Sequence, residues 1–413
     1  MIFNEVTIIL GTITLFLAVV APFFSPFCRF RKAFKQLVSD DMIENKTNKI
    51  KEKTTEEEDA TDTENIVSVL SASSIPSIPM TILITIHDQA KELEEHLPAF
   101  LSQEYNADFQ VVVVAEQNDN ATEDILKRYA SNPRLYSTFI PSSSRYMSRK
   151  KLAITLGVKA AKHEWIIMTD ISCKPASPHW LQLMSKQCTI NNKLVIGYSN
   201  YDSSTKKSYQ IEQLYTELYL VKKTYRNIAY RTNSANLAFR KSIFMKEEGY
   251  RGNLHLLRGE YDFIVNKYAE KDSTGLVINQ DAWMVEDEPQ RKTWLNKHLF
   301  YMESRKYLKR SAAIKARFYM DMFLLHFTYL SILALLVYSL LSMNYILIAT
   351  ATVSLIATLA IRIQLSKRIM HFFLEDISVW KVIPFEISII WRQLSYHLSY
   401  RKADKNDFTS HKL

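Results

Sequence analysis

The chain has 413 residues, of which 47% are hydrophobic and 23% charged, and its long uncharged runs lie at the two ends. This distribution excludes a fully disordered chain and a transporter with many spanning helices. Seven glycines leave little material for a glycine-rich phosphate cradle. The formal charge of +9 is concentrated beside the apolar runs, which indicates a membrane surface rather than nucleic acid. Three cysteines without a zinc-like spacing favour a reducing compartment.

The first apolar run predicts a retained membrane anchor. Residues 6–28 carry no charge, enough for a helix that crosses ~30 Å of hydrocarbon. Arg29, Arg31 and Lys32 follow directly, whereas a cleaved signal peptide would begin with basic residues. Because basic residues favour the cytoplasmic flank, the N-terminus is expected outside and the following domain inside the cell.

A second membrane region is predicted near the C-terminus. Residues 322–361 contain no Asp, Glu, Lys or Arg, which fits a hairpin of two spans turning at 342–344 with both ends in the cytoplasm. Residues 377–398 are apolar but are interrupted by charges and a proline, and we interpret them as an interfacial or re-entrant segment, with a further span as the alternative. The sequence thus predicts a multi-pass protein of the cytoplasmic membrane whose soluble domain faces the cytoplasm.

Four regions follow from these assignments. Residues 1–38 are the anchor with its basic flank, and residues 39–78 are a polar linker that buries too little apolar surface to fold. Residues 79–310 form the soluble domain. Residues 311–413 hold the membrane hairpin, the interfacial helix and a polar tail.

The soluble domain begins with alternating strands and helices. Strands are predicted at 81–86, 109–114, 135–140 and 165–169, and helices at 92–102, 122–129 and 151–161. Continuous apolar strands between helices indicate an α/β fold whose mostly parallel central sheet is covered on both faces. Such sheets bind ligands at the carboxyl ends of their strands. Polar residues stand there after the strands, among them His87, Glu116 and Asp170.

This ordered series resembles the family 2 glycosyltransferases. The segments that carry the resemblance are 82–101, 111–116 followed by 120–126, 150–153, and 165–175, and the similarity extends over about 79–310. It implies a nucleotide-sugar-binding domain of the type called GT-A, and the anchor with the C-terminal hairpin is similar to membrane-bound bacterial members. Segments 233–241 and 257–262 look like the family's acceptor side.

The resemblance assigns the donor side to residues after the strands. In the family an Asp-x-Asp motif binds the nucleotide and a divalent cation, Mg²⁺ or Mn²⁺, but here Asp170 is followed by Ser172, a weak ligand. A turn cap is the alternative role for Asp170. Glu116 matches the position of a base-binding acid, unless it is an exposed loop acid. Lys150 and Lys151 are expected to approach the diphosphate, or else to form a solvated basic face.

The resemblance also suggests an acceptor side and a base. Glu260 and Asp262 are the candidate catalytic carboxylates that deprotonate the acceptor hydroxyl, with Asp262 favoured, although a salt bridge is the alternative. In an alternative register Tyr261 occupies the usual carboxylate position, and Asn236 lies in the other acceptor-side segment. The family's processive members carry Gln-x-x-Arg-Trp. Gln290 and Trp294 match its outer pair with Thr293 in place of arginine, for which coincidence is the competing explanation.

Two hypotheses follow from these residues. The first is a membrane-bound glycosyltransferase that moves a sugar from a nucleotide-sugar donor to a lipid-linked or cell-envelope glycan acceptor, with the basic segment 294–317 on the bilayer. The second is a catalytically weakened relative that serves as a scaffold or binding subunit in a glycan-assembly complex. No nucleic-acid partner is expected, since the basic residues stand beside the membrane spans.

Overall fold

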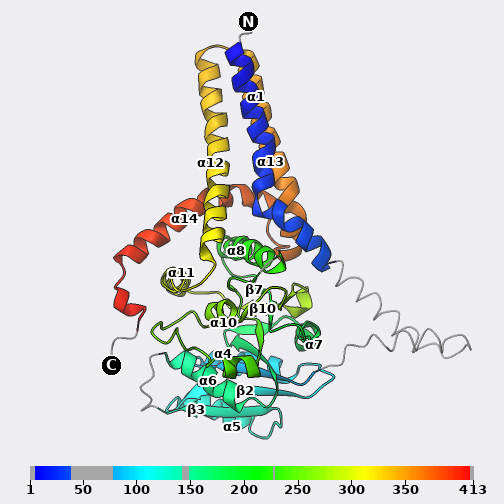
Figure 1. Cartoon of the computed structure of the whole chain (residues 1–413), viewed down its shortest axis with the longest axis vertical. Coiled ribbons are helices and arrows are strands. Elements are labelled where there is room, and N and C mark those ends of the chain that lie inside the picture. The colour runs from blue at the N-terminus through cyan, green and yellow to red at the C-terminus, as the bar shows by residue number, and fades with distance from the viewer. Residues whose placement is uncertain (1–4, 39–77, 142–147, 227, 410–413) are drawn as a thin grey trace, which may run out of the picture. The chain divides into compact units, whose positions relative to one another are not determined.

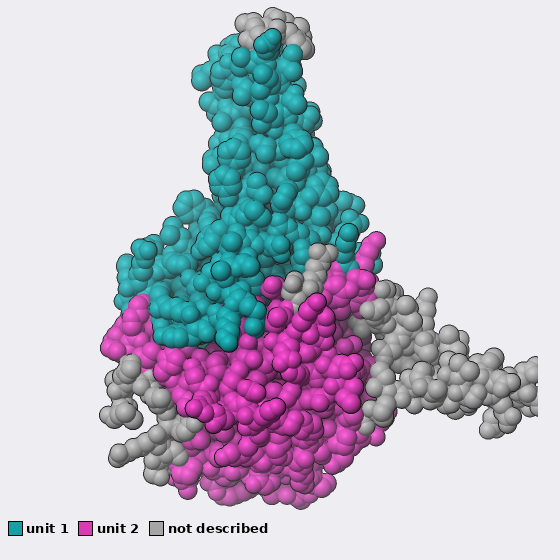
Figure 2. Space-filling view, in the orientation of Figure 1, with its two compact units in different colours: residues 1–32, 203–222, 288–403 teal, residues 33–202, 223–287, 404–413 magenta. Residues whose placement is uncertain are grey.

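The computed structural model describes residues 5–38, 78–141, 148–226 and 228–409. The chain forms two compact units, coloured separately in Figure 2. The first comprises residues 1–32, 203–222 and 288–403, and the second comprises residues 33–202, 223–287 and 404–413. Residues 39–77, which hold nearly all of the expected linker, lie outside the described ranges.

A seven-stranded sheet organises the second unit. Its order is β3-β2-β1-β4-β8-β6-β9, and β8 alone runs antiparallel to its neighbours. The strands are β1 (Met80–Thr85), β2 (Phe109–Glu116), β3 (Leu135–Ile140), β4 (Trp165–Asp170), β6 (Leu194–Gly197), β8 (Leu237–Arg240) and β9 (Thr274–Val277). In register, Thr85 of β1 stands opposite Val114 of β2 and Asp170 of β4, so these strands end at one edge.

Helices cover both faces of this sheet. They are α4 (Ala90–Leu101), α5 (Asn120–Arg128), α6 (Arg149–Ala160), α7 (Trp180–Lys186), α9 (Lys241–Lys246) and α10 (Glu260–Tyr268). One core packs Ile82 and Ile84 with residues of α4, α5 and α7, and the opposite core packs Leu83 with residues of α6 and α10. This alternation along β1 follows from the two-residue period of a strand, and it explains why the buried strands read as continuous apolar runs.

Gly157 allows α6 to lie close to the sheet. A Cβ atom at this position would stand 2.1 Å from Cδ1 of Leu83 and 3.1 Å from Cγ2 of Val114. Both neighbours are buried core side chains with little room to move. The glycine therefore fixes the depth of the helix whose first turn carries Arg149, Lys150 and Lys151.

A small sheet lies beyond the end of β4. Its order is β5-β10-β7, formed by β5 (Cys173–Pro175), β10 (Met284–Glu286) and β7 (Ser199–Tyr201), and the 3-10 turn η2 (Gln280–Ala282) precedes β10. Because β5 begins three residues after Asp170, it fixes the course of the chain through Ser172. The backbone N–H of Asp287 donates to the carbonyl of Ser172 at 3.0 Å, next to the pairing of Glu286 with Cys173.

The first unit is helical. Its elements are α1 (Glu5–Val20), η1 (Ala21–Phe24), α8 (Lys207–Arg226, up to residue 222), α11 (Arg291–Ser304), α12 (Ser311–Leu341), α13 (Tyr345–Phe373), η3 (Val379–Lys381) and α14 (Val382–Lys402). Helices α1, α12 and α13 run side by side (Figure 1). Thr7, Gly11, Thr14 and Ala18 form the buried stripe of α1. Small side chains at this spacing allow close approach of helices that lack a hydrophobic drive to associate.

Three of these helices are long and apolar enough to cross a membrane. They cover Glu5–Phe24, Ser311–Leu341 and Tyr345–Phe373, and Asn344 caps α13 after the turn that follows α12. The described residues thus confirm the predicted N-terminal apolar helix and the apolar helical hairpin that turns at 342–344. The segment 377–398 contributes η3 and most of α14, and it is not among these three spans.

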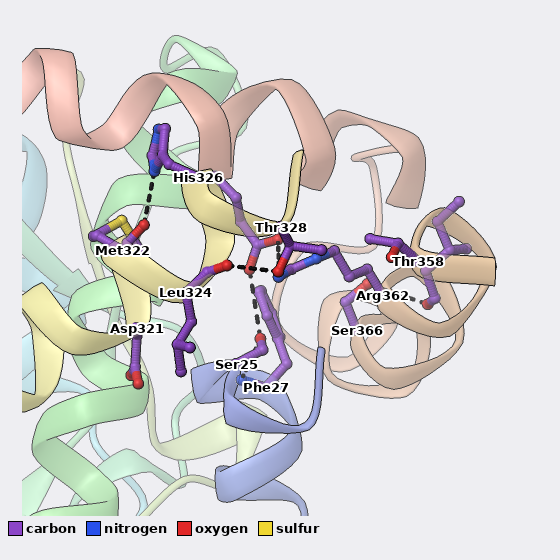
Figure 3. Close-up of polar contacts among 12 residues, drawn as sticks. Ser25, Phe27, Asp321, Met322, Leu324, His326, Thr328, Thr358, Arg362 and Ser366 are labelled. Atoms are coloured by element: carbon purple, nitrogen blue, oxygen red, sulfur yellow. Dashed lines mark hydrogen bonds and ion pairs between the residues drawn. The ribbon is translucent and has the colours of Figure 1, made fainter. Parts of the chain in front are cut away.

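Two ion pairs, one of them fully buried, join segments of the helical unit. Arg29 contacts the carboxylate of Asp321 in α12 at 2.9 Å, and the hydroxyl of Tyr219 donates to the same carboxylate at 2.8 Å. Arg362 of α13 contacts Glu386 of α14 at 2.9 Å, with both side chains at most 4% exposed. Ser25, Asp321 and Arg362 project from three different elements in Figure 3. The first pair joins residues that are 292 positions apart in the sequence, and the second joins residues that are 24 positions apart.

The predicted strands and helices of the soluble domain agree with the structure to within two residues at almost every boundary. The α/β fold with a mostly parallel sheet is therefore confirmed. The segment 294–317, expected as one amphipathic stretch, instead contains most of α11 and the first turns of α12, separated by Arg310 with a φ of 69°. Helix α11 ends at Ser304, and the left-handed Arg310 is the N-cap of α12.

Candidate functional site

Asp170 is the last residue of β4 and forms the centre of the candidate site. The ammonium of Lys150, in the first turn of α6, donates to its Oδ1 at 2.7 Å. The hydroxyl of Tyr261 in α10 donates to the same oxygen at 3.1 Å. The structure therefore brings together three residues that the sequence analysis selected from separate segments.

Charge and burial set the protonation of this group. Burial disfavours the charged form of Lys150, but the negative charges of Asp170 and Glu260 outweigh it and raise the Lys150 pKa. Burial, reinforced by the charge of Asp170, raises the pKa of Tyr261 well above its usual value. At neutral pH the site thus holds a protonated ammonium and a neutral phenol, both able to donate hydrogen bonds.

Glu116 ends β2, which β1 separates from β4, and forms a second cluster. Its Oε1 accepts from Nε of Arg149 at 2.7 Å and lies 2.9 Å from Nδ1 of His87. His87 follows β1, so three adjacent chain segments meet at this edge of the sheet. Arg149 was not selected from the sequence, although its position directly before the two lysines is a signal that could have identified it.

The two candidate catalytic carboxylates lie in the first turn of α10. Gly259, with a φ of 97°, precedes the helix and its N–H donates to Oε2 of Glu260 at 3.2 Å. The Oε1 atom of Glu260 is buried and has no hydrogen-bond partner among the described residues. Asp262 is also buried, and its Oδ1 lies 3.7 Å from Nη1 of Arg231. The negative charge of Glu260 thus acts on Lys150, whereas Asp262 lies beside Arg231.

Lys151 makes a different set of contacts from its neighbour Lys150. Its side chain is fully buried and donates to the backbone carbonyls of Asn253 at 2.6 Å and Leu256 at 2.5 Å, and to the Asn253 side chain at 2.8 Å. Burial lowers the pKa of Lys151 to about 8. All three ammonium protons are used inside the protein, so the structure places Lys151 in a loop anchor rather than beside Asp170.

Asn236 is likewise committed within the core. Its Oδ1 accepts from the indole N–H of Trp180 at 3.2 Å, and its Nδ2 donates to the carbonyls of Tyr198 at 3.3 Å and Ala282 at 2.9 Å. The side chain is completely buried. These contacts tie the sheet to α7 and η2, and the structure does not bring Asn236 to the group around Asp170.

Gln290 and Trp294 belong to the helical unit. Gln290 is the exposed residue before α11, and its carbonyl accepts the backbone N–H of Trp294 at 2.9 Å. The Trp294 ring stacks on Tyr209 with centroids 4.0 Å apart, and its indole N–H donates to the hydroxyl of Tyr396 at 3.0 Å. Trp294 thus packs α11 against α8 and α14.

A buried carboxylate adjoins this aromatic stack. Glu212 of α8 accepts from the hydroxyl of Tyr396 at 3.2 Å and from Arg392 at 3.4 Å, and His298 lies 3.8 Å from its other oxygen. Burial raises the pKa of Glu212 to about 7, although Arg392 and Tyr396 oppose this shift. The sequence analysis did not select Glu212, because nothing in an amphipathic helix marks one acid as buried.

The residues after β4 do not form a good site for a divalent cation. Mg²⁺ and Mn²⁺ prefer several hard oxygen ligands, and here Asp170 is the one carboxylate while Ser172 offers a neutral oxygen. Lys150 already stands 2.7 Å from the carboxylate. Among the described residues, no cluster of three or more His, Cys, Asp or Glu is placed to hold a metal ion.

Residues 81–247 match the model of the family described as glycosyl transferase family 2. The matched segment contains Asp170 and Lys150 but not Tyr261. The match confirms the resemblance seen in the sequence. Residues 81–247 are thus similar to the family 2 glycosyltransferases. No curated protein sequence matches the chain significantly.

Solved structures similar to this chain include a mannosyltransferase and the TarS protein. The mannosyltransferase PcManGT from Pyrobaculum calidifontis, in complex with GDP-Man and Mn²⁺, is 14% identical with a TM-score of 0.47, over 93% of this chain and 99% of that chain. The S. aureus TarS 1–349 structure in complex with UDP-GlcNAc is 12% identical with a TM-score of 0.39, over 79% of this chain and 92% of that chain.

Proposed function

We propose that the protein is a membrane-bound glycosyltransferase that transfers a sugar from a nucleotide-sugar donor to a lipid-linked or cell-envelope glycan acceptor. The observation that carries the proposal is the meeting of Asp170, Lys150 and Tyr261 at the carboxyl edge of a parallel sheet within the matched domain. Ligands bind at this edge in open α/β sheets. The three apolar helices supply the membrane attachment.

The donor would be bound at the ends of β2 and β4. Lys150 and Arg149 lie in the first turn of α6, where the helix dipole adds to their charge in attracting a diphosphate. Asp170 and Glu116 hold these cations in place and leave acceptor oxygens for the hydroxyls or the base of the nucleotide. Part of each contact remains solvent-exposed, so a donor can reach it.

The transfer requires a base for the acceptor hydroxyl. In the proposed step the acceptor oxygen bonds to the anomeric carbon, its proton passes to a carboxylate, and the bond to the diphosphate breaks with its electron pair on the phosphate oxygen. Asp262 and Glu260 are the candidates for that carboxylate. The resemblance implies Mg²⁺ or Mn²⁺, but Asp170, Ser172 and Lys150 fit such an ion poorly.

The proposed location is the cytoplasmic membrane, with the domain in the cytoplasm. Arg29, Arg31 and Lys32 follow α1, and Arg305, Lys306 and Lys309 precede α12. Basic residues at these helix ends favour the cytoplasmic side for both. Cysteine labelling of the full chain in intact cells, at position 343 in the hairpin turn and at position 124 in α5, tests the orientation.

Donor binding by the full-length protein in detergent tests the transferase proposal. Asp170→Ala should abolish binding of UDP- and GDP-linked sugars and their transfer to lipid-linked acceptors. Asp124→Asn, which alters an exposed carboxylate of α5, serves as the matched control and should retain both. Retained donor binding and transfer in Asp170→Ala would contradict the assignment, and unchanged association with a glycan-assembly partner without transfer would favour the scaffold hypothesis.

A further inference from the structure

Asp170, the one carboxylate of the Asp-x-Asp pattern that this chain retains, already faces a positive charge. The Lys150 ammonium contacts Oδ1 of Asp170 at 2.7 Å, and the two side chains are 30% and 28% exposed. The ammonium thus has both an internal partner and an open side. A surface lysine without an ion pair is open to solvent but has no internal partner, and a core lysine such as Lys151 has internal partners but is not open to solvent.

Neighbouring groups hold this ammonium in position. Tyr261 donates to the same Asp170 oxygen, and its ring centroid lies 5.6 Å from Nζ of Lys150. The buried carboxylate of Glu260 adds a negative charge that favours the protonated lysine, and its Oε1 has no hydrogen-bond partner among the described residues. A cation fixed by one carboxylate, one phenol and one further negative charge is pre-organised to meet an anion.

The chain also lacks the second acid that a cation would need. Ser172 follows Asp170 by two residues, and its carbonyl is bound by the Asp287 N–H in the small sheet. A divalent ion at Asp170 would have to displace Lys150 and would gain a neutral hydroxyl in return. The lysine is covalently present at a high local concentration, which favours the internal ion pair.

We propose that Lys150 supplies the positive charge that receives the donor diphosphate, so that this chain binds its nucleotide without a divalent cation. Asp170 and Tyr261 act as positioning residues for that ammonium. The proposal rests on the proposed function, because it takes a nucleoside diphosphate as the ligand of this edge. On this proposal Ser172 stands in place of the second aspartate because the Lys150 ammonium takes the role of the divalent cation, and not because the protein has lost its activity.

Nucleotide binding with and without metal tests the proposal. The full-length protein in detergent is titrated with UDP and with GDP by calorimetry, first in EDTA and then with Mn²⁺. Binding of at least one nucleotide is expected, with dissociation constants within about twofold in the two conditions. Lys150→Ala should weaken binding by about tenfold or more, and Lys150→Arg should restore most of it. Lys159→Ala, an exposed lysine at the other end of α6, should bind as the parent does.

A direct metal readout complements the titration. The electron paramagnetic resonance signal of free Mn²⁺ should fall no further with protein and nucleotide together than with the nucleotide alone. Binding that requires Mn²⁺, or a protein-bound Mn²⁺ signal lost in Asp170→Ala, would overturn this proposal while supporting a donor site. Absence of binding to both nucleotides in both conditions would instead refute the proposed function, and this inference with it.

Discussion

The Arg362–Glu386 pair gives a sharp test of how the helical unit is held together. The pair joins α13 to α14 at 2.9 Å, and both side chains are almost fully buried. The hydroxyl of Ser25 also donates to Glu386 at 3.4 Å. Removing one partner leaves an uncompensated buried charge, so Arg362→Met and Glu386→Leu should each lower the free energy of unfolding by about 3–5 kcal/mol.

The double variant should behave differently from the sum of the two. Arg362→Met with Glu386→Leu removes both charges and fills their volume, which leaves the stability within about 1–2 kcal/mol of the parent. Unfolding of the three variants in mixed micelles measures the coupling energy. The exposed pair of Arg128 with Glu94 at 2.6 Å is the matched control, with an expected coupling of at most about 1 kcal/mol. Additive losses at Arg362 and Glu386 would refute the reasoning.

Three further substitutions test single features. Burial raises the Glu212 pKa to about 7 from an ordinary 4.5, so protonated Glu212 contributes its full stabilisation below pH 4.5. The free energy of unfolding should then fall by about 3 kcal/mol as the pH rises through 7. In melting experiments Glu212→Gln should flatten this pH profile, whereas the exposed Glu375→Gln should not. Lys151→Met leaves two buried carbonyls without their donor and should cost about 3 kcal/mol in denaturant titrations, so a loss below about 0.5 kcal/mol would contradict the loop-anchor role. Gly157→Ala should cost about 1–3 kcal/mol by the same assay, since its Cβ would overlap Leu83; an unchanged midpoint would show that the core can yield.

The strands of the soluble domain were predictable because each is a short apolar run bounded by polar residues. Strand β3 is predicted with its exact bounds, Leu135–Ile140, although it is a half-exposed edge strand. The insertion of β8 between β4 and β6 was not predictable in the same way. Its pairing depends on long-range contacts that the local pattern of residues 237–240 does not record.

The candidate site was only partly predictable from the sequence. Lys150 and Lys151 are adjacent and chemically alike, and the resemblance assigned both to the diphosphate. Consecutive residues on a helix point about 100° apart, so one lysine meets Asp170 and the other enters the core. Which of the two faces the sheet edge depends on the rotation of α6, and that rotation is set by packing at Gly157 rather than by the lysines themselves.

The pairing of α1 with helices from the far end of the chain has a consequence for biosynthesis. The ribosome makes α1 first, yet α12 and α13, against which it packs, are made about 300 residues later. Arg29 must therefore wait for Asp321, 292 residues later, before its charge is neutralised. During that interval the newly made anchor lacks its helix partners, and Arg29 lacks the carboxylate of Asp321. A truncated product that stops short of α12 would never gain them, and we expect quality-control proteases to degrade it.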